Sequence, residues 1–257
     1  HCAVKHRCYR GSRLQTVLCV LSTRLHRALK TYSRLHYITL TDFNRQKLLA
    51  LKQIPPENVS VKPNFVEPPE TIVPYAAREN QVVYIGRLDA LKGIRLLLEA
   101  WARYERSGGG MKLIICGTGP EEAWCREYLT REKLKQVELR GFVPNSAARA
   151  LMGQSKALIL PTQWYEGFPM ILAEAMAIGC PVVSTNIGNA GDILVNSKGG
   201  TTFEPDKPDT FINAIEDVLQ NNEIYQKNAL AYYSETLSKD KNYVLQNDIY
   251  EHLFGGG

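Results

Sequence analysis

From residue 81 to residue 185, short apolar runs alternate with longer segments of helical periodicity. The apolar runs, of five or six residues each, cover 81–86, 112–117, 137–141, 156–161 and 181–185, and the helical segments between them cover 90–105, 120–132, 145–153 and 169–179. Strands separated by helices pair in parallel through right-handed crossovers, with helices on both faces of the sheet. The alternation therefore predicts the α/β class, with a doubly wound parallel sheet.

The residues on either side of this region have patterns that predict further structural elements. Residues 63–80 contain four prolines, which favours an extended connector. We expect residues 1–62 to form a partial N-terminal region, with a strand at 36–40 and a helix that begins at Thr41 or Asp42. The main domain then covers residues 81–235, and residues 236–257 form a C-terminal helix and a glycine tail. A start at His1 without an initiator Met indicates a fragment, a processed form or an engineered form.

Positive charge is concentrated in the N-terminal region. Residues 1–62 contain 12 Lys and Arg but only Asp42 and Glu57 as acids, a net charge of +10, whereas the remaining 195 residues carry −5. Within residues 11–35, apolar side chains recur every three or four residues and the basic ones lie off that stripe, which predicts an amphipathic helix. Two interpretations stay open. The helix lies on an anionic membrane surface, or it packs its apolar face on a core and exposes a solvated basic face.

Composition and segment length bear on location and partners. The apolar runs are far shorter than the roughly 20 residues that span a bilayer, and no signal peptide is visible. We therefore expect a cytoplasmic protein, peripheral on the inner face of a membrane if the first interpretation holds. The six cysteines include no Cys-x-x-Cys pair, which favours reduced thiols. The basic region lacks interleaved aromatic residues, so no nucleic acid is expected as a partner.

The loops after the predicted strands carry glycines and cations. They follow one another on the edge where ligands bind in a doubly wound sheet. Glycine lets the backbone approach a ligand closely, and the unpaired N–H groups at the start of each following helix favour anions. The side chains of Arg87 and Lys92 add positive charge, so the edge is predicted to bind an anion. The residues that form it are Gly86, Arg87 and Lys92, then Gly117 and Gly119, then Phe142 and Val143, and finally Gly167.

Glu166 and Glu174 lie on either side of the apolar stretch 168–172. Eight residues of ideal helix turn about 800°, which leaves the two carboxylates some 80° apart. We therefore expect Glu166 in a loop and Glu174 on the second turn of a helix whose first residue is Pro169. A carboxylate next to a bound anion can still accept hydrogen bonds from a neutral part of the same ligand, such as a pair of vicinal hydroxyls. Together with Arg87 and Lys92, the glutamates predict a diphosphate flanked by two polyhydroxylated rings, as in a nucleotide-sugar.

Four motifs carry a resemblance to a known family. The stretches YIGRLDALKG (84–93), GTGP (117–120), GFVP (141–144) and YEGFPMILAEAMAIGCPVVST (165–185) resemble the donor-binding domain of the retaining family-four (group 1) glycosyltransferases of the GT-B fold. The spacing of Glu166 and Glu174 is similar to that family's glutamate motif. Parts of residues 8–66 resemble the end of such an enzyme's first, acceptor-side domain and its connector, so the resemblance covers nearly the whole chain.

The resemblance implies a role for each site residue. Arg87 and Lys92 would hold the donor diphosphate, Glu174 the ribose hydroxyls and Glu166 the transferred sugar. Arg87, Lys92 and Glu166 are thus the implied catalytic residues. No Asp-x-Asp pair occurs in the sequence, so neither a metal nor a cofactor is expected. The backbone near Phe142 and Val143 would receive the base, and the sugar and phosphate would be lined by the backbone of Gly167, Phe168, Pro169, Met170 and Ile171.

The family's activity implies a glycosyltransferase. It would transfer a hexose from a nucleotide-sugar, with a UDP-sugar favoured, to a polysaccharide or lipid-linked acceptor, with retention of anomeric configuration. This chain departs from the family in having room for only part of a first domain, and IGNAGDIL (187–194) stands where the family has Gly-Gly-x-x-Glu. The alternative is therefore a donor-binding fragment or subunit without a complete catalytic site. A related phosphorylase or epimerase of the same fold is a third hypothesis.

Two weaker signals complete the set. His1, Cys2, His6 and Cys8 are potential zinc ligands, but their irregular spacing favours an unstructured terminus. Trp164, in the loop before Glu166, is a candidate to line the mouth of the ligand site.

Overall fold

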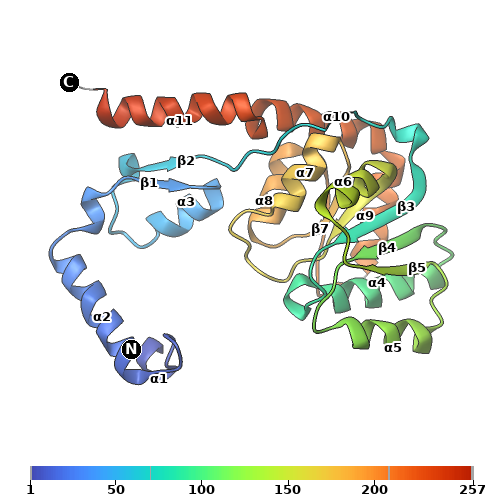
Figure 1. The fold of residues 1–257 in the computed structure, drawn as a ribbon, viewed down its shortest axis with the longest axis horizontal. Helices are drawn as coiled ribbons and strands as arrows, with labels where there is room; N and C mark the ends of the chain where they lie inside the picture. The colour runs from blue at the N-terminus through green and yellow to red at the C-terminus, as the bar shows by residue number, and fades with distance from the viewer. Residues whose placement is uncertain (1, 70, 208, 256–257) are drawn as a thin grey trace. The chain divides into compact units, whose positions relative to one another are not determined.

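A computed structural model describes residues 2–69, 71–207 and 209–255, and the chain divides into two compact units, residues 1–62 and 63–257 (Figure 1). The first unit contains a small parallel pair of strands, with Tyr37 opposite Val59. The side chain of Thr41 accepts a hydrogen bond from the Asn44 N–H, so Thr41 caps the helix that follows. The elements of this unit are α1 (Cys2–Lys5), α2 (Arg13–Ala28), β1 (Tyr37–Thr39), α3 (Asp42–Leu49) and β2 (Val59–Val61), with 3-10 turns at Tyr32–Arg34 and Pro56–Asn58.

The amphipathic helix α2 is shorter than predicted. It begins after Ser12 and ends at Ala28, because Lys30 has a φ of +53° and the Thr31 N–H closes the helix on the His26 carbonyl at 2.9 Å. Among the described residues, the apolar stripe is not packed into a core. Its exposed leucines are Leu14, Leu18, Leu21, Leu25 and Leu29.

The second unit is built on one parallel sheet of six strands, which confirms the predicted fold class. The strand order is β5-β4-β3-β6-β7-β8, and Val83 of the central strand lies opposite Ile114 on one side and Leu158 on the other. The last strand was not predicted, since its sequence GTTF is short and mostly polar. The strands are β3 (Glu79–Ile85), β4 (Lys112–Cys116), β5 (Val137–Gly141), β6 (Ser155–Leu160), β7 (Val182–Thr185) and β8 (Gly200–Phe203).

Helices cover both faces of this sheet (Figure 1). Alternate residues of β3 belong to two separate apolar clusters: Val82 and Tyr84 pack with α4, α5 and α9, and Val83 packs with α6, α7, α8 and α10. Each face is therefore dry, as the continuous apolar runs predict. The helices are α4 (Ile94–Arg106), α5 (Glu122–Glu132), α6 (Asn145–Gln154), α7 (Met170–Ile178), α8 (Gly188–Ser197), α9 (Asp209–Gln220), α10 (Asn222–Tyr232) and α11 (Lys239–Phe254).

Two predicted helix starts are wrong. The first long helix begins at Ile94 rather than residue 90, because Gly93 has a φ of +76° and separates a 3-10 turn (Ala90–Lys92) from α4. A Cβ at Gly93 would lie 1.7 Å from the Pro161 carbonyl oxygen, so this position brings the loops after β3 and β6 into contact. Pro169 is the N-cap of α7 and not its first helical residue, because its backbone is extended.

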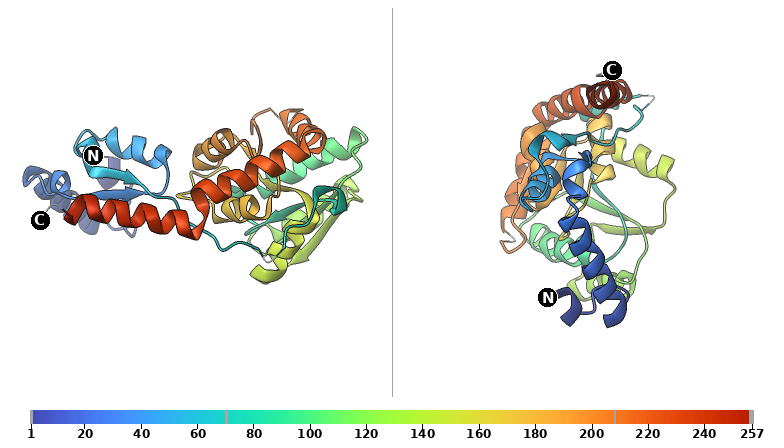
Figure 2. Two further views of the ribbon diagram at one scale, coloured as in Figure 1. Left: turned by 90° about the horizontal axis from the view of Figure 1, so that it is seen from above. Right: turned by 90° about the vertical axis from the view of Figure 1, so that its left-hand side faces the viewer.

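The C-terminal segment forms hydrogen bonds with the proline-containing segment 63–80. Between α10 and α11 the chain makes a π-helical turn (Tyr233–Leu237), and Figure 2 shows α11 as one long helix. The Tyr233 hydroxyl donates to the Val66 carbonyl at 3.2 Å, and the Asn242 side chain donates to the Pro63 carbonyl at 2.6 Å. Tyr243 of α11 is 66% exposed. Among residues 2–69, 71–207 and 209–255, the structure contains no helix with the length and hydrophobicity that crossing a bilayer requires.

Candidate functional site

The winding of the sheet reverses between β3 and β6. From β3 the chain proceeds to β4 and β5 on one side and then returns to place β6 on the other side of β3. At such a switch point the loops after the two central strands diverge and leave a crevice at their carboxyl ends, where ligands of doubly wound domains bind. Here those loops are the segment from Gly86 to Gly93 and the segment from Pro161 to Pro169.

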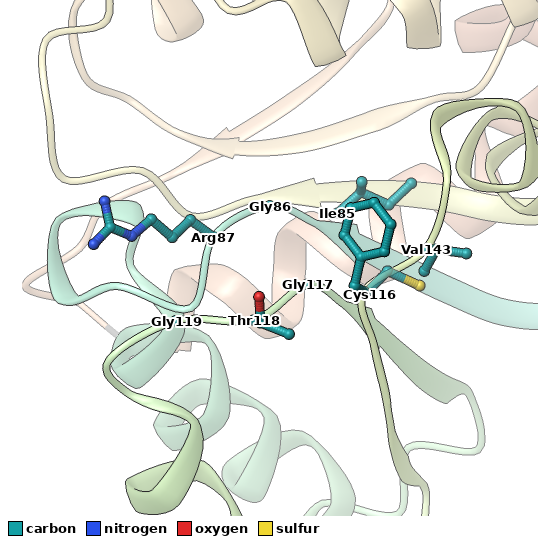
Figure 3. Close-up of a pocket in the computed structure, with 9 residues that line it drawn as sticks. Ile85, Gly86, Arg87, Cys116, Gly117, Thr118, Gly119 and Val143 are labelled. Atoms are coloured by element: carbon teal, nitrogen blue, oxygen red, sulfur yellow. The ribbon is translucent and has the colours of Figure 1, made fainter.

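A cavity of about 450 Å³ opens at the carboxyl ends of β3 and β4 (Figure 3). Six predicted site residues line it: Gly86, Arg87, Gly117, Gly119, Phe142 and Val143. Three further lining residues, Ile85, Cys116 and Thr118, were missed. Their sequence signal was adjacency, since each directly precedes or follows a predicted glycine. The mouth of the cavity is open to solvent beside Phe142, which is 77% exposed.

Gly117 brings two loops together rather than leaving space for a ligand. It has a φ of +142°, and a Cβ on it would lie 1.8 Å from the Gly86 carbonyl oxygen. The Gly86 N–H in turn donates to the Cys116 carbonyl at 3.0 Å, so hydrogen bonding continues past the strand ends. The sequence interpretation, that these glycines serve approach to a ligand, is therefore incomplete. Gly117 first serves the packing of the loops that form the cavity.

Arg87 lies at the rim of the cavity. Its side chain is 68% exposed, with Nε 3.8 Å from Asp89 Oδ2, and Figure 3 shows it extending away from Cys116 and Val143. The Tyr84 hydroxyl donates to the Arg87 carbonyl at 2.8 Å. Burial raises the pKa of Tyr84 far above its usual value, so this donor stays protonated and holds the backbone below the arginine.

Lys92 and Glu166 meet across the switch point. The Lys92 Nζ lies 2.9 Å from Glu166 Oε1, although the two residues are 74 positions apart in the sequence. The carboxylate is the more enclosed partner, with a side chain 15% exposed against 40% for the lysine. The contact joins the loop after β3 to the loop after β6. It brings together a cation and a carboxylate that sequence analysis assigned to different parts of one ligand.

Glu174 lies on α7, beside the start of α6. It is on the second turn of α7, as the helical arithmetic predicts, whereas Glu166 is in the preceding loop. The Asn145 side chain at the start of α6 approaches Glu174 Oε1 at 3.5 Å, so this carboxylate adjoins the loop that carries Phe142 and Val143. The rest of the predicted set does not line the 450 Å³ cavity. It forms the loop and first turn of α7: Gly167, Phe168, Pro169, Met170 and Ile171.

Two further residues lie in or beside this loop: Trp164, which the sequence singled out as a candidate, and Asn189, which it did not. Trp164 is 56% exposed and does not line the cavity. Its backbone N–H donates to the Thr162 hydroxyl at 3.3 Å. Asn189 was missed. Its side-chain amide donates to the carbonyls of Glu166 and Gly167. No sequence signal identified it, because the partners lie more than 20 positions away.

The buried thiol of Cys116 is poorly suited to act as a nucleophile. Burial raises the pKa of its thiol, so the reactive thiolate is disfavoured. The proposed zinc set also lacks support: His1 lies outside the described residues, and among the residues that the structure describes no group of three or more His, Cys, Asp or Glu could hold a metal ion. The charged side chains that sequence analysis assigned to this edge are Arg87, Lys92, Glu166 and Glu174.

The chain is similar to known proteins in family pattern, in sequence and in fold. The sequence pattern of the family described as "Glycosyl transferases group 1" matches residues 72–240. The chain is 29% identical over 164 residues to the glycogen synthase of Mycobacterium tuberculosis. The aligned region covers 62% of this chain and 39% of that protein. It is 27% identical over 212 residues to the lipopolysaccharide 1,6-galactosyltransferase of Salmonella typhimurium, covering 80% and 58%. The chain thus spans about two to three fifths of the length of these relatives.

Solved structures share the fold. The lipopolysaccharide outer core galactosyltransferase WaaB in its apo form superposes with a TM-score of 0.71 at 21% identity, covering 84% of this chain and 62% of that one. Anabaena HepE in complex with UDP superposes with a TM-score of 0.67 at 20% identity, with the same coverage. The pattern match extends over well over half of the residues, so this chain belongs to the glycosyl transferases group 1 family.

Proposed function

We propose that this edge of the sheet binds the nucleotide-sugar donor of a retaining glycosyltransferase of family four, with a UDP-sugar favoured. The donor would supply a hexose to a polysaccharide or lipid-linked acceptor. The observation that carries the proposal is the Lys92–Glu166 contact of 2.9 Å, since it joins a phosphate-binding cation to a hydroxyl-binding carboxylate at the switch point. The complexes of HepE with UDP and with UDP-glucose support the class of ligand by analogy of fold.

The proposed donor runs along the edge in four parts. The base enters the cavity beside Phe142 and Val143, and the ribose hydroxyls donate to Glu174. The diphosphate lies between Arg87, Lys92 and the first N–H groups of α7, which begins at Met170. The sugar hydroxyls donate to Glu166. This order leaves each carboxylate beside a neutral, hydroxyl-bearing ring.

The chemistry needed at this edge is stabilisation of a leaving group. The bond between the anomeric carbon and the diphosphate oxygen breaks, and negative charge grows on that oxygen. Fixed positive charge aimed at it lowers the barrier. Arg87 and Lys92 supply that charge without a metal, together with the start of α7. The acceptor hydroxyl forms the new bond from the same face of the sugar and gives its proton to the departing diphosphate oxygen, which retains the anomeric configuration.

Calorimetric titration with UDP-, GDP- and ADP-sugars tests the donor. We expect one class to bind through both the nucleotide and the sugar, and binding of none would overturn the proposal. Where turnover is detected, proton NMR of the first product distinguishes retention from inversion. Release of sugar phosphate that requires inorganic phosphate, without nucleotide binding, would identify a phosphorylase instead.

A donor-binding module without transfer activity of its own is the second candidate. The chain covers 39% and 58% of the length of the two relatives described above. Adding the first domain of a relative in trans, with donor and acceptor present, separates the two candidates. Sugar transfer by the chain alone contradicts the module, and donor binding without nucleotide release under both conditions supports it.

We further propose that α2 contacts an anionic membrane surface. Five exposed leucines form one stripe of this helix, and Arg13, Arg24 and Arg27 lie on one flank of it. Replacing Leu18, Leu21 and Leu25 by serine should abolish co-sedimentation with phosphatidylserine-containing vesicles. Val195→Ser, at a residue 65% exposed in the second unit, serves as the control. Equal sedimentation of both variants would contradict the membrane contact.

A further inference from the structure

We propose that Asn189 is a positioning residue for the sugar-binding end of the donor site. It would set the direction of the peptide groups on both sides of Gly167, and with them the place of the Glu166 carboxylate. The inference rests on the proposed function, because it assigns a purpose to the loop that would hold the donor sugar. It concerns a side chain to which neither the motifs nor the implied donor contacts gave a role.

The contacts of Asn189 are made from a buried position. The residue is 1% exposed and is the second residue of α8. Its Nδ2 donates to the Glu166 carbonyl and to the Gly167 carbonyl, the latter at 2.9 Å. One amide group thus holds two successive carbonyls of a loop 22 residues away or more. Buried amides with both N–H bonds satisfied resist rotation, so the loop is held in one orientation.

Peptide geometry turns this contact into a statement about the opposite side of the loop. In a trans peptide the C=O and N–H groups point in opposite directions, and no cis bond occurs among the described residues. Because Asn189 draws the carbonyls of Glu166 and Gly167 toward α8, the N–H groups of Gly167 and Phe168 point away from α8. These N–H groups therefore lie on the side of the loop that Asn189 does not occupy.

A second contact between α8 and the loop fixes the residue before Glu166. A Cβ at Gly188 would lie 2.6 Å from Tyr165 Cδ1, so the tyrosine ring packs directly on the glycine backbone. Three consecutive loop residues, Tyr165, Glu166 and Gly167, therefore contact two consecutive residues of α8, Gly188 and Asn189. From the Glu166 backbone held in this way, its carboxylate reaches Lys92 at 2.9 Å.

The proposal depends on the amide hydrogens of Asn189 and not on its size. Aspartate has nearly the same shape but no N–H group, and its carboxylate would face two carbonyl oxygens. Asn189→Asp therefore removes the donors and adds repulsion while it preserves packing. Asn196→Asp makes the same chemical change at an exposed position of the same helix and is the matched control.

The first test needs no ligand. Amide hydrogen exchange, followed by mass spectrometry of peptides from residues 161–172, should speed up about 10-fold or more in Asn189→Asp and remain unchanged in Asn196→Asp. Peptides from β3 and β4 report on the domain as a whole and should not change. Unchanged exchange in the loop would overturn the proposal, and so would a uniform rise across the domain, because that result indicates general loss of stability.

The second test separates positioning from structural support. We expect Asn189→Asp to lower the preference for UDP-glucose over UDP by about 10-fold, the effect of losing roughly one strong hydrogen bond to the sugar. Equal losses for UDP and UDP-glucose, or no change in their ratio, would contradict the assigned role. If the wild-type chain binds no nucleotide-sugar, the proposed function fails, and the exchange measurement still decides whether Asn189 orients the loop.

Discussion

Replacement of Glu166 by glutamine tests the division of the donor between cation and carboxylate. In the free protein the Lys92 Nζ donates to Glu166 Oε1 at 2.9 Å. Glutamine keeps the shape of the side chain but removes its charge. We expect binding of UDP-glucose to weaken, because the sugar hydroxyls lose a charged acceptor. Binding of UDP should stay the same or tighten, because the carboxylate no longer competes with phosphate for the lysine.

The expected size follows from the kind of bond that is lost. A hydrogen bond to a charged group contributes about 1.5–3 kcal/mol, which corresponds to a roughly 10- to 150-fold loss of UDP-glucose affinity. The effect on folding should be smaller. The lysine side chain is 40% exposed, so solvent screens the pair, and its loss should change the free energy of unfolding by less than about 1 kcal/mol.

Isothermal titration calorimetry with UDP and UDP-glucose measures both affinities, and urea denaturation measures the free energy of unfolding. Glu132→Gln is the matched control, since Glu132 pairs with Arg106 at the far end of α4 from the crevice. Lys92→Ala completes a double-mutant cycle and should weaken both ligands by a similar factor. Equal losses of UDP and UDP-glucose in Glu166→Gln would refute the reasoning, because the carboxylate would then act on the nucleotide.

Three further predictions concern the loops, the absence of a metal and the thiols. Gly117→Ala should lower the free energy of unfolding in urea by about 1–3 kcal/mol or more, because the residue has a φ of +142°. Gly110→Ala, with no atom within 4 Å of its added carbon, should change it by less than about 0.5 kcal/mol; equal effects would contradict the close approach of the loops. A chelator should leave donor affinity in calorimetry unchanged, since the proposed site assigns the positive charge to Arg87 and Lys92, and a loss of affinity would point to a metal. Iodoacetamide at pH 8 should spare the buried thiols, because burial raises the pKa of Cys125 and Cys180 to about 11, above the working pH, and peptide mapping that finds either one modified in the folded protein would contradict this. The exposed thiols that should react are Cys2, Cys8 and Cys19.

Local pattern was sufficient for most of the main domain. Apolar runs flanked by helical segments predict five of the six strands, because burial on both faces leaves a continuous apolar signature. It fails for β8, whose GTTF sequence is short and mostly polar. The place of Glu166 in a loop and of Glu174 on a helix also follows from sequence alone, since the rotation per residue of a helix is constant.

Boundaries were predicted less well, because close approach between distant segments decides them. The start of α4 depends on Gly93, whose conformation is set by contact with the Pro161 carbonyl, 68 positions later. Likewise, the amphipathic pattern of α2 left open whether its leucines pack on a core or face outward. The structure exposes them.

Sequence pattern was enough to predict five of the six strands and the helices between them, and to indicate which residues can supply charge at the carboxyl edge. The three-dimensional structure was needed to show that β6 lies beside β3, that Lys92 meets Glu166, and that Asn189 donates to the loop that carries Glu166. The physical reason is that periodicity records which face of a segment is buried. The order of strands and the contacts between their loops depend on packing among segments far apart in the chain.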